Sequence, residues 1–227
     1  MSLTIIGVDP SITKTGVVVS RDGETRGLLI APPKGAPDLA RQNWIAEQVV
    51  ALTLNKGPFA VPLTWETLEL GLRDVLLAIE GTGHLQGHGR VNIGLHSMIR
   101  DRMADKANVQ TLEIPPSTLK KFVTRNGKAE KSEMGAYIIR HWGKEIGDDV
   151  PCEDVLEAFA LLKFAECYLH PDDECWTQYQ RDTATQASGR KTGPRLLECD
   201  SKDLDKARGW PRPTKTWAFG AAAEVAA

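Results

Sequence analysis

The chain contains no apolar run of the ~18–20 residues that a membrane-spanning helix requires. Its first residues lead directly into a short apolar segment, without the basic stretch and the longer apolar stretch of a signal peptide. These two absences predict a cytoplasmic protein with no membrane partner.

An excess of positive charge is also missing. The 28 Lys and Arg residues are outnumbered by 30 Asp and Glu residues, which gives a formal net charge of −2. No global positive field therefore draws the protein toward a polyanion such as nucleic acid. A nucleic-acid partner would have to meet a local basic patch.

Cysteine is scarce, and all four residues lie in the last third of the chain, at Cys152, Cys167, Cys175 and Cys199. Their spacing does not predict a disulfide framework, which agrees with a reducing cytosol. The last three could ligate zinc together with His170. Ordinary buried or free thiols are the more common interpretation of so loose a group.

The length and the hydrophobic pattern indicate one main domain. At 227 residues, of which 41% are hydrophobic, the chain is long enough to bury a sizeable core. Periodicity disappears from His170 onward, where polar and charged residues dominate. We predict a folded domain over 1–169 and a polar tail over 170–227, partly disordered or forming an arm that orders on binding.

Within the domain, short strands come first and helices later. Three apolar runs are joined by turns too short for a crossover, which predicts an antiparallel meander. Later apolar runs alternate with helical patterns, which predicts parallel crossovers. The expected strands cover 3–9, 16–20, 27–31, 75–80 and 109–114, and the expected helices begin near 38, 64, 92, 117, 129 and 152, with a loop over 55–62. The class is α/β: a mixed five-stranded sheet, with three antiparallel strands followed by parallel ones, flanked by helices.

Two of the expected strands end in a carboxylate. LTIIGVD ends at Asp9, and VLLAIE ends at Glu80. The carboxyl ends of strands in open α/β sheets form ligand sites, so the two acids converge if their strands are neighbours. An ionised carboxylate is expensive to bury unless it is paired or binds a metal.

A late helix, CEDVLEAFALLKFAECYL, supplies Asp154 and Glu157, which are three positions apart and share a face. The helix macrodipole also favours acids in a first turn, and this explains Glu153 well. Convergent carboxylates need a compensating cation, and hard oxygen ligands suit Mg²⁺, with Mn²⁺ as a substitute. Two such ions about 4 Å apart can activate a water and stabilise the leaving oxygen in phosphodiester hydrolysis. The pattern indicates a candidate metal site with Asp9 and Glu80. For Asp154 and Glu157 taken alone, the helix macrodipole is the more common explanation, and the pattern by itself does not name an enzyme.

Positive charge is concentrated around the turn formed by Asn126 and Gly127. Such a patch can hold phosphates close to a metal site, although a solvated charged face is the ordinary alternative. The glycine-rich loop GTGHLQGHGR fits neither the dinucleotide-binding spacing nor the P-loop, but it follows Glu80 closely enough to touch a bound phosphate chain. The candidate phosphate contacts are Lys121, Arg125, Lys128, Lys131 and, from this loop, Arg90.

Several segments resemble the RuvC family of Holliday junction resolvases, within the RNase H-like nucleases. GVDPSITKTGVVV is similar to the opening motif of the family, LLAIEGT to the strand that ends in its second acid, and EDVLEAFALLKFA to its late helix with two acids three apart. FVTRNGKAEKSEM, between them, is the most specific match. Together the segments span roughly residues 3 to 169.

The resemblance implies an RNase H-like nuclease domain over 1–169. It implies a Mg²⁺-dependent endodeoxyribonuclease, a homodimer that cleaves branched DNA at four-way junctions with two metal ions in each site. The four acids become the metal ligands, Lys121, Lys128 and Lys131 become contacts for DNA or for transition-state charge, and Lys128 is the catalytic cation. The setting would be a bacterial or a phage-infected cell.

Two residues depart from the family pattern. Ser11 stands where a glycine is usual after the proline, a mild change in turn chemistry. Glu157 stands where aspartate is more common, and its longer side chain alters metal spacing or the tolerance for Mn²⁺.

Three other functions remain open. The first is an RNase H-like nuclease that acts on flaps, forks or RNA–DNA hybrids, since fold does not fix substrate. The second is a non-catalytic protein that binds branched DNA, although a binding module has no need for four costly carboxylates. The third and most remote is an actin-like ATPase or sugar kinase, whose later glycine-rich adenosine motif is not found after residue 114.

Overall fold

The computed structural model describes residues 3–53, 75–82, 89–104, 109–185, 195–197 and 215–219. The loop expected over 55–62 and the helix expected from 64 lie outside these residues. In the described part, no helix is both long and apolar enough to cross a membrane.

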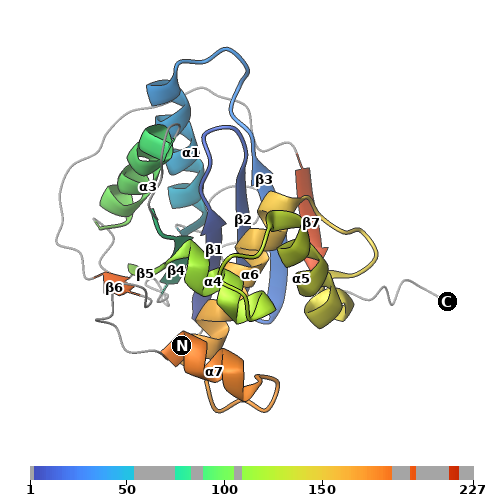
Figure 1. Ribbon diagram of the computed structural model, residues 1–227. Coiled ribbons are helices and arrows are strands. Elements are labelled where there is room, and N and C mark those ends of the chain that lie inside the picture. Colours follow the sequence, from blue (N-terminus) through green and yellow to red (C-terminus); the bar gives the residue numbers. More distant parts are fainter. Residues whose placement is uncertain are drawn as a thin grey trace, which may run out of the picture.

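A mixed sheet forms the centre of the molecule (Figure 1). Its strands are β1 (Thr4–Asp9), β2 (Thr15–Arg21), β3 (Glu24–Ile30), β4 (Val75–Glu80), β5 (Val109–Ile114), β6 (Arg195–Leu197) and β7 (Lys215–Phe219). β1 pairs antiparallel with β2, which pairs antiparallel with β3. On its other side β1 pairs parallel with β4, which pairs parallel with β5. The predicted mixed five-stranded arrangement is thereby confirmed.

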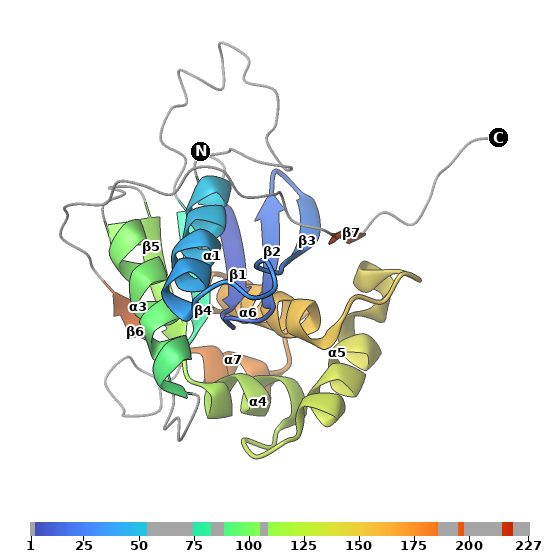
Figure 2. The same ribbon diagram turned by 90° about the horizontal axis from the view of Figure 1, so that it is seen from above.

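Helices cover both faces of the sheet (Figure 2). They are α1 (Asp38–Thr53), α3 (Gly89–Ala104), α4 (Pro116–Thr124), α5 (Lys131–Ile146), α6 (Glu153–Leu169) and α7 (Gln178–Thr185). α1 and α3 bury one apolar core against the sheet, and α6 buries a second core on the other face together with α4, α5 and α7. Along β1, Ile6 and Val8 belong to the first core and Ile5 to the second, as the alternation of a strand requires.

Two glycines bring α6 unusually close to the sheet. A Cβ atom on Gly7 would collide with the carbonyl oxygen of Ala158, and one on Gly16 would collide with that of Asp154. Because neither strand residue has a side chain, the backbone of α6 lies directly against β1 and β2. The first turns of α6 are therefore held beside the carboxyl end of β1.

We expect Gly16→Ala to lower the free energy of unfolding by about 1–3 kcal/mol, because the added methyl group overpacks this contact and displaces α6. Thermal unfolding followed by circular dichroism measures the loss. Gly143→Ala on α5 is the matched control, since its Cβ would meet only Ile139 Cγ2 at an ordinary 3.7 Å. Equal stability of the two variants would contradict the proposed close packing.

The structure adds two edge strands and a helix that the sequence pattern did not predict. β6 pairs antiparallel with β5, and β7 pairs antiparallel with β3, so the described sheet has seven strands rather than five. Trp176 and Ala184 are buried in the core beneath α6. Parts of the segment over 170–227 thus pack on the described fold, and the domain boundary at residue 169 stays a prediction. Strands of three and five residues are too short to show a reliable period, and α7 is mostly polar.

Candidate active site

The predicted acids come from three elements that meet at one edge of the sheet. Asp9 is the last residue of β1, and Glu80 is the last residue of β4. These strands are parallel neighbours in register, so the two acids lie at the same edge. Asp154 and Glu157 come from the first two turns of α6, which the glycine contacts hold against the sheet. The side chains of Asp9 and Glu157 are buried.

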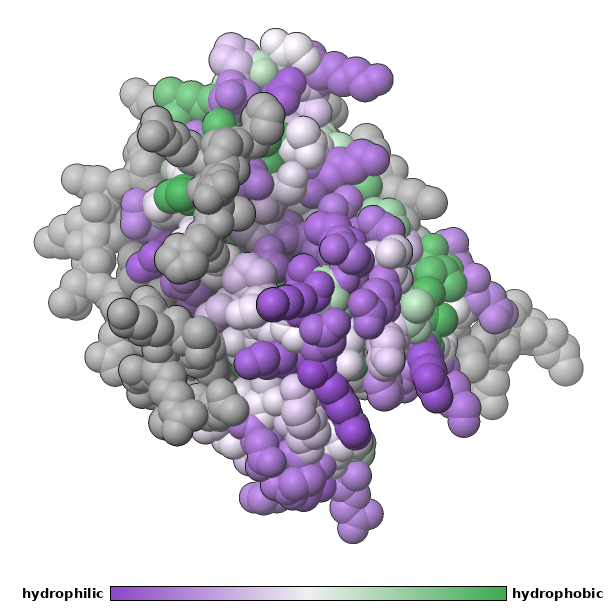
Figure 3. Space-filling model, viewed as in Figure 1, coloured by the Kyte–Doolittle hydropathy of each residue, from purple (hydrophilic) through white to green (hydrophobic). Residues whose placement is uncertain are grey.

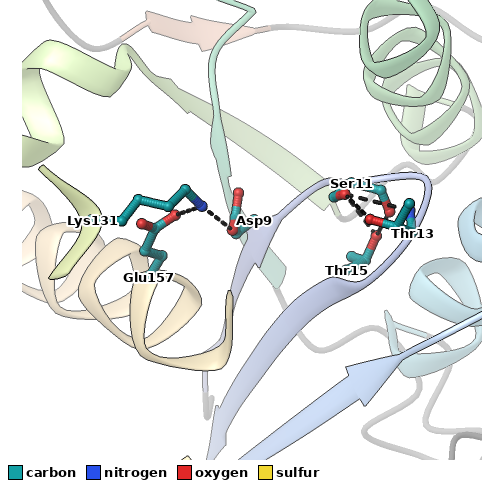
Figure 4. A network of polar contacts seen from close by, with 6 residues as sticks. All are labelled: Asp9, Ser11, Thr13, Thr15, Lys131 and Glu157. Atoms are coloured by element: carbon teal, nitrogen blue, oxygen red, sulfur yellow. Dashed lines mark hydrogen bonds and ion pairs between the residues drawn. The ribbon is translucent and has the colours of Figure 1, made fainter. Parts of the chain in front are cut away.

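Lys131, the first residue of α5, bridges two of these acids (Figure 4). Its Nζ atom donates a hydrogen bond of 2.8 Å to Glu157 Oε2 and lies 3.9 Å from Asp9 Oδ2. The Lys131 side chain is 55% exposed, so solvent reaches it even though its ammonium contacts two acids. The described site thus combines buried negative charge with a cation that an external ligand can reach.

Burial and neighbouring acids raise the pKa values of two of these acids. Burial, and then the charges of Glu80 and Glu157, raise the pKa of Asp9 well above its usual range, and Lys131 offsets only part of the effect. Burial and then the charge of Glu157 raise the pKa of Glu80 to about 7, against the opposing charges of Lys131 and Lys120. The site therefore favours the binding of either protons or additional positive charge.

We expect the protein in EDTA to become less stable as the pH rises through this range. A glutamate with the ordinary pKa of 4.5 in the unfolded chain and about 7 in the folded one binds more protons when folded. The stability that Glu80 contributes is complete below pH 4.5 and is lost as the pH rises through about 7. The thermal midpoint should fall by roughly 5 °C between pH 5.5 and 8, and Glu80→Gln should reduce this fall. An identical pH dependence in parent and variant would exclude Glu80 as its source.

The donor set fits a hard divalent cation. Among the described residues, no group of three or more His, Cys, Asp or Glu side chains is arranged to hold a metal ion as it stands. The Lys131 ammonium lies between Asp9 and Glu157 in this arrangement (Figure 4). Yet the side chains are carboxylates, Asp9 and Glu157 are buried, and burial together with the neighbouring acids raises the pKa values of Asp9 and Glu80. Oxygen donors of this kind suit a hard divalent cation.

Hydroxyl groups shape the turn that follows Asp9 (Figure 4). The Ser11 N–H donates to Thr15 Oγ1 at 3.1 Å, and that hydroxyl donates to the Ser11 carbonyl oxygen at 2.7 Å. The Ile12 N–H donates to Asn92 Oδ1 of α3 at 3.3 Å. Ser11 has no positive φ angle, so its replacement of the usual glycine introduces no backbone strain. The turn is fixed both internally and to α3, and it holds the end of β1 in place.

Of the predicted basic residues, Arg125 and Lys128 lie on the connection between α4 and α5, and Lys121 lies in the last turn of α4. Asn126 organises this turn, because its N–H donates to Thr124 Oγ1 at 3.0 Å and its Oδ1 accepts from the Lys128 N–H at 3.0 Å. Lys121, Arg125 and Lys128 are exposed there. Figure 3 shows hydrophilic side chains gathered over α4 and α5 on this face.

The predicted basic positions have different surroundings. Lys131 contacts the acids directly, whereas Lys128, which we expected to be catalytic, is an exposed residue of the turn. The catalytic role of Lys128 stays a prediction. Arg90 lies in the first turn of α3, and its side chain is outside the described part of the structure.

Two lysines that the sequence did not assign to the site act on the acids. Lys14 was not singled out, and Lys120 was interpreted as part of a solvated charged face. Lys120 opposes the raised pKa of Glu80, and Lys14 opposes the raised pKa of Asp154, whose main cause is burial. Both lysines are therefore close enough to interact electrostatically with a carboxylate of the site. The position of Lys120 on the α4 helix was visible in the sequence, but the distance from α4 to the end of β4 was not.

The zinc interpretation of the late cysteines gains no support. Cys167 is buried, and burial raises the pKa of its thiol to about 12, which disfavours the thiolate that zinc requires. Cys152, Cys167 and Cys175 are all free thiols, and Cys199 lies outside the described residues.

Comparison with known proteins identifies the fold. No protein-family model and no curated protein matches the chain. It is similar to the structure of Thermus thermophilus RuvC in complex with a Holliday junction substrate, with 17% identity and a TM-score of 0.51, over 74% of this chain and 96% of that chain. A second Thermus thermophilus RuvC structure gives 16% identity and a TM-score of 0.47, over 70% of this chain and 90% of that chain. The mixed sheet of this chain and its similarity to the first of these two structures show that it has a RuvC-like fold.

Proposed function

We propose that the protein is a structure-selective endonuclease that cleaves branched DNA, most of all four-way junctions, by two-metal-ion hydrolysis of phosphodiester bonds. The observation that carries this proposal is the meeting of Asp9, Glu80 and Glu157 at one sheet edge, where burial first, and then repulsion between the acids, raises the pKa values of Asp9 and Glu80. A structural ion pair needs only one acid beside a lysine. Several acids around one lysine are instead typical of a site that attracts divalent cations.

Asp9, Glu80, Asp154 and Glu157 would hold the ions, with Mg²⁺ as the natural metal and Mn²⁺ as a substitute. Two bound ions would supply an activated water and a stabilised leaving oxygen. The rigid ends of β1, β4 and α6 fix the carboxylates relative to one another. Lys131 adds a positive charge at the solvent side of the site, where a phosphate oxygen of DNA can reach it.

Branched DNA is the proposed partner for two reasons. The basic residues Lys121, Arg125 and Lys128 are exposed beside the site, on a protein whose net charge is −2. In addition, a RuvC structure with the same fold holds a Holliday junction substrate. Cutting a four-way junction into two duplexes requires two strand cuts, which a homodimer with one site per subunit would provide. The helix α3, on which Ile93 is 39% exposed, is the proposed contact between the two copies.

A direct test is the cleavage of a labelled mobile four-way junction beside matched linear duplex, flap, fork and RNA–DNA hybrid. Each substrate is incubated with Mg²⁺, with Mn²⁺ and with EDTA. Paired symmetrical nicks in the junction that require a metal would establish the proposed activity. Preferred cleavage of flaps, forks or hybrids would retain the metal site and replace the substrate. Tight junction binding without cleavage under any condition would indicate a binding protein instead.

A further inference from the structure

We propose that Tyr179 of α7 is a positioning residue, which holds Arg125 in place to bind a phosphate group of DNA. The DNA-binding face would then extend from the connection between α4 and α5, here called the basic turn (residues 125–130), onto α7, which lies beyond the expected end of the domain at residue 169. This inference rests on the proposed function, and it names a residue that the sequence pattern did not mark.

Tyr179 contacts both the side chain and the main chain of Arg125. The guanidinium carbon lies 5.4 Å from the centroid of the tyrosine ring, within the range of a cation–π contact. The Tyr179 hydroxyl donates to the Arg125 carbonyl oxygen at 3.4 Å. One side chain thereby restrains the position of the whole residue.

The backbone of Arg125 indicates that its placement is specific. Its φ angle is 66°, in the left-handed region that glycine usually occupies, at the end of α4. Its N–H donates to the Lys121 carbonyl oxygen at 2.8 Å, and Asn126 and Thr124 tie the next residues of the turn together. An exposed arginine stands at a position where glycine would be the least strained choice.

The surroundings of Arg125 suit an external anion. In the described part of the chain, Arg125 forms no ion pair with an acid. Its charge and that of Arg140 on α5 both lower the pKa of His141, after partial burial of that histidine. Arg125 and Arg140 therefore place two positive charges close to His141 on this part of the surface. Such a cluster attracts a phosphate backbone.

α7 has an anchor of its own, so it can support Arg125 rather than depend on it. The buried Trp176, just before α7, packs on Phe122 of α4 with ring centroids 6.2 Å apart. Inside α7, the buried Thr183 donates to the Tyr179 carbonyl oxygen at 2.8 Å. The contact between Trp176 and Phe122 therefore fixes the start of α7 against α4, and Tyr179 extends from α7 to Arg125.

The test measures binding of a labelled four-way junction in EDTA over a series of salt concentrations. Tyr179→Leu should weaken binding roughly threefold, whereas Tyr179→Phe, which keeps the ring, should bind like the parent. Arg125→Ala should weaken binding and reduce the salt slope by about 1, as expected for one lost phosphate contact. The double variant Tyr179→Leu with Arg125→Ala should bind no more weakly than Arg125→Ala alone.

Gln178→Ala is the control on the same helix, because the Gln178 side chain is exposed and donates a hydrogen bond to the exposed Asp182 at 2.8 Å. Tyr179→Gln serves as a second ringless variant if the leucine variant fails to fold. Unchanged or tighter binding by a folded ringless variant, or effects that add to those of Arg125→Ala, would overturn the role of Tyr179. If the parent protein does not bind the junction, the proposed function fails. If the parent binds and a folded ringless variant binds equally well, only the role of Tyr179 fails.

Discussion

Asp9→Asn is expected to reduce cleavage of a four-way junction by at least about 10³-fold. The amide preserves the shape of the side chain at the end of β1 but removes the charge that would face a divalent cation. Binding of the junction should persist and even become slightly tighter, because one negative charge disappears from beneath the DNA while the basic turn remains. Single-turnover nicking with Mg²⁺ and a binding titration in EDTA measure the two effects separately.

Asp148→Asn is the matched control for this experiment. It makes the same chemical change at an exposed residue of the connection between α5 and α6. We expect it to cleave like the parent. If Asp9→Asn kept substantial cleavage while it folded normally, Asp9 could not be an essential metal ligand and the assignment of the site would be refuted.

Lys131→Met is expected to reduce cleavage by roughly 10²-fold, because it removes an ammonium that contacts both Asp9 and Glu157. Mn²⁺ should still bind and should bind more tightly, since a positive charge beside the carboxylates is gone. In EDTA at pH 8 the variant should also unfold at a lower temperature, because two buried acids lose their counter-charge. Single-turnover kinetics, Mn²⁺ titration and thermal unfolding follow these three effects.

Lys128→Met provides the comparison for Lys131. It removes an equal charge three positions earlier, from an exposed residue of the turn. We expect Lys128→Met to weaken DNA binding in a salt-dependent manner. Its single-turnover cleavage rate at saturating DNA tests the predicted catalytic role of Lys128, which a rate equal to that of the parent would exclude. If the two variants lost cleavage equally, the distinction between a cation in the site and a cation on the turn would fail.

The sequence pattern predicted those parts of the fold that depend on local periodicity. The strands that end at Asp9 and Glu80 were expected at nearly their observed bounds, because buried strands of six residues leave clear apolar runs. The convergence of these acids also followed from the rule for strand ends in α/β sheets. β6 and β7 were not predicted, because short edge strands are held by backbone hydrogen bonds that leave little trace in composition.

Pairings between distant segments were the other gap. Lys131 was predicted to contact phosphate, and its ion pairs with Glu157 and Asp9 became visible only with the α5–α6 packing. Tyr179 lies in a segment expected to be a polar tail, and nothing in QYQRDTAT indicates a partner on α4. Charge and hydropathy identify which residues can bind ions or phosphates. They do not predict which of these residues the fold brings into contact.

The wide separation of the acids along the chain has a consequence for folding. Asp9 belongs to the first strand, whereas Glu157 belongs to a helix in the last third, and they meet only when α6 packs on β1. Contacts of such long sequence separation form late and slow the folding of a domain. A nascent chain on the ribosome therefore holds an incomplete set of acids until α6 has emerged and docked. A nuclease assembled in this way would be unable to cut DNA before α6 has been synthesised and has packed on β1.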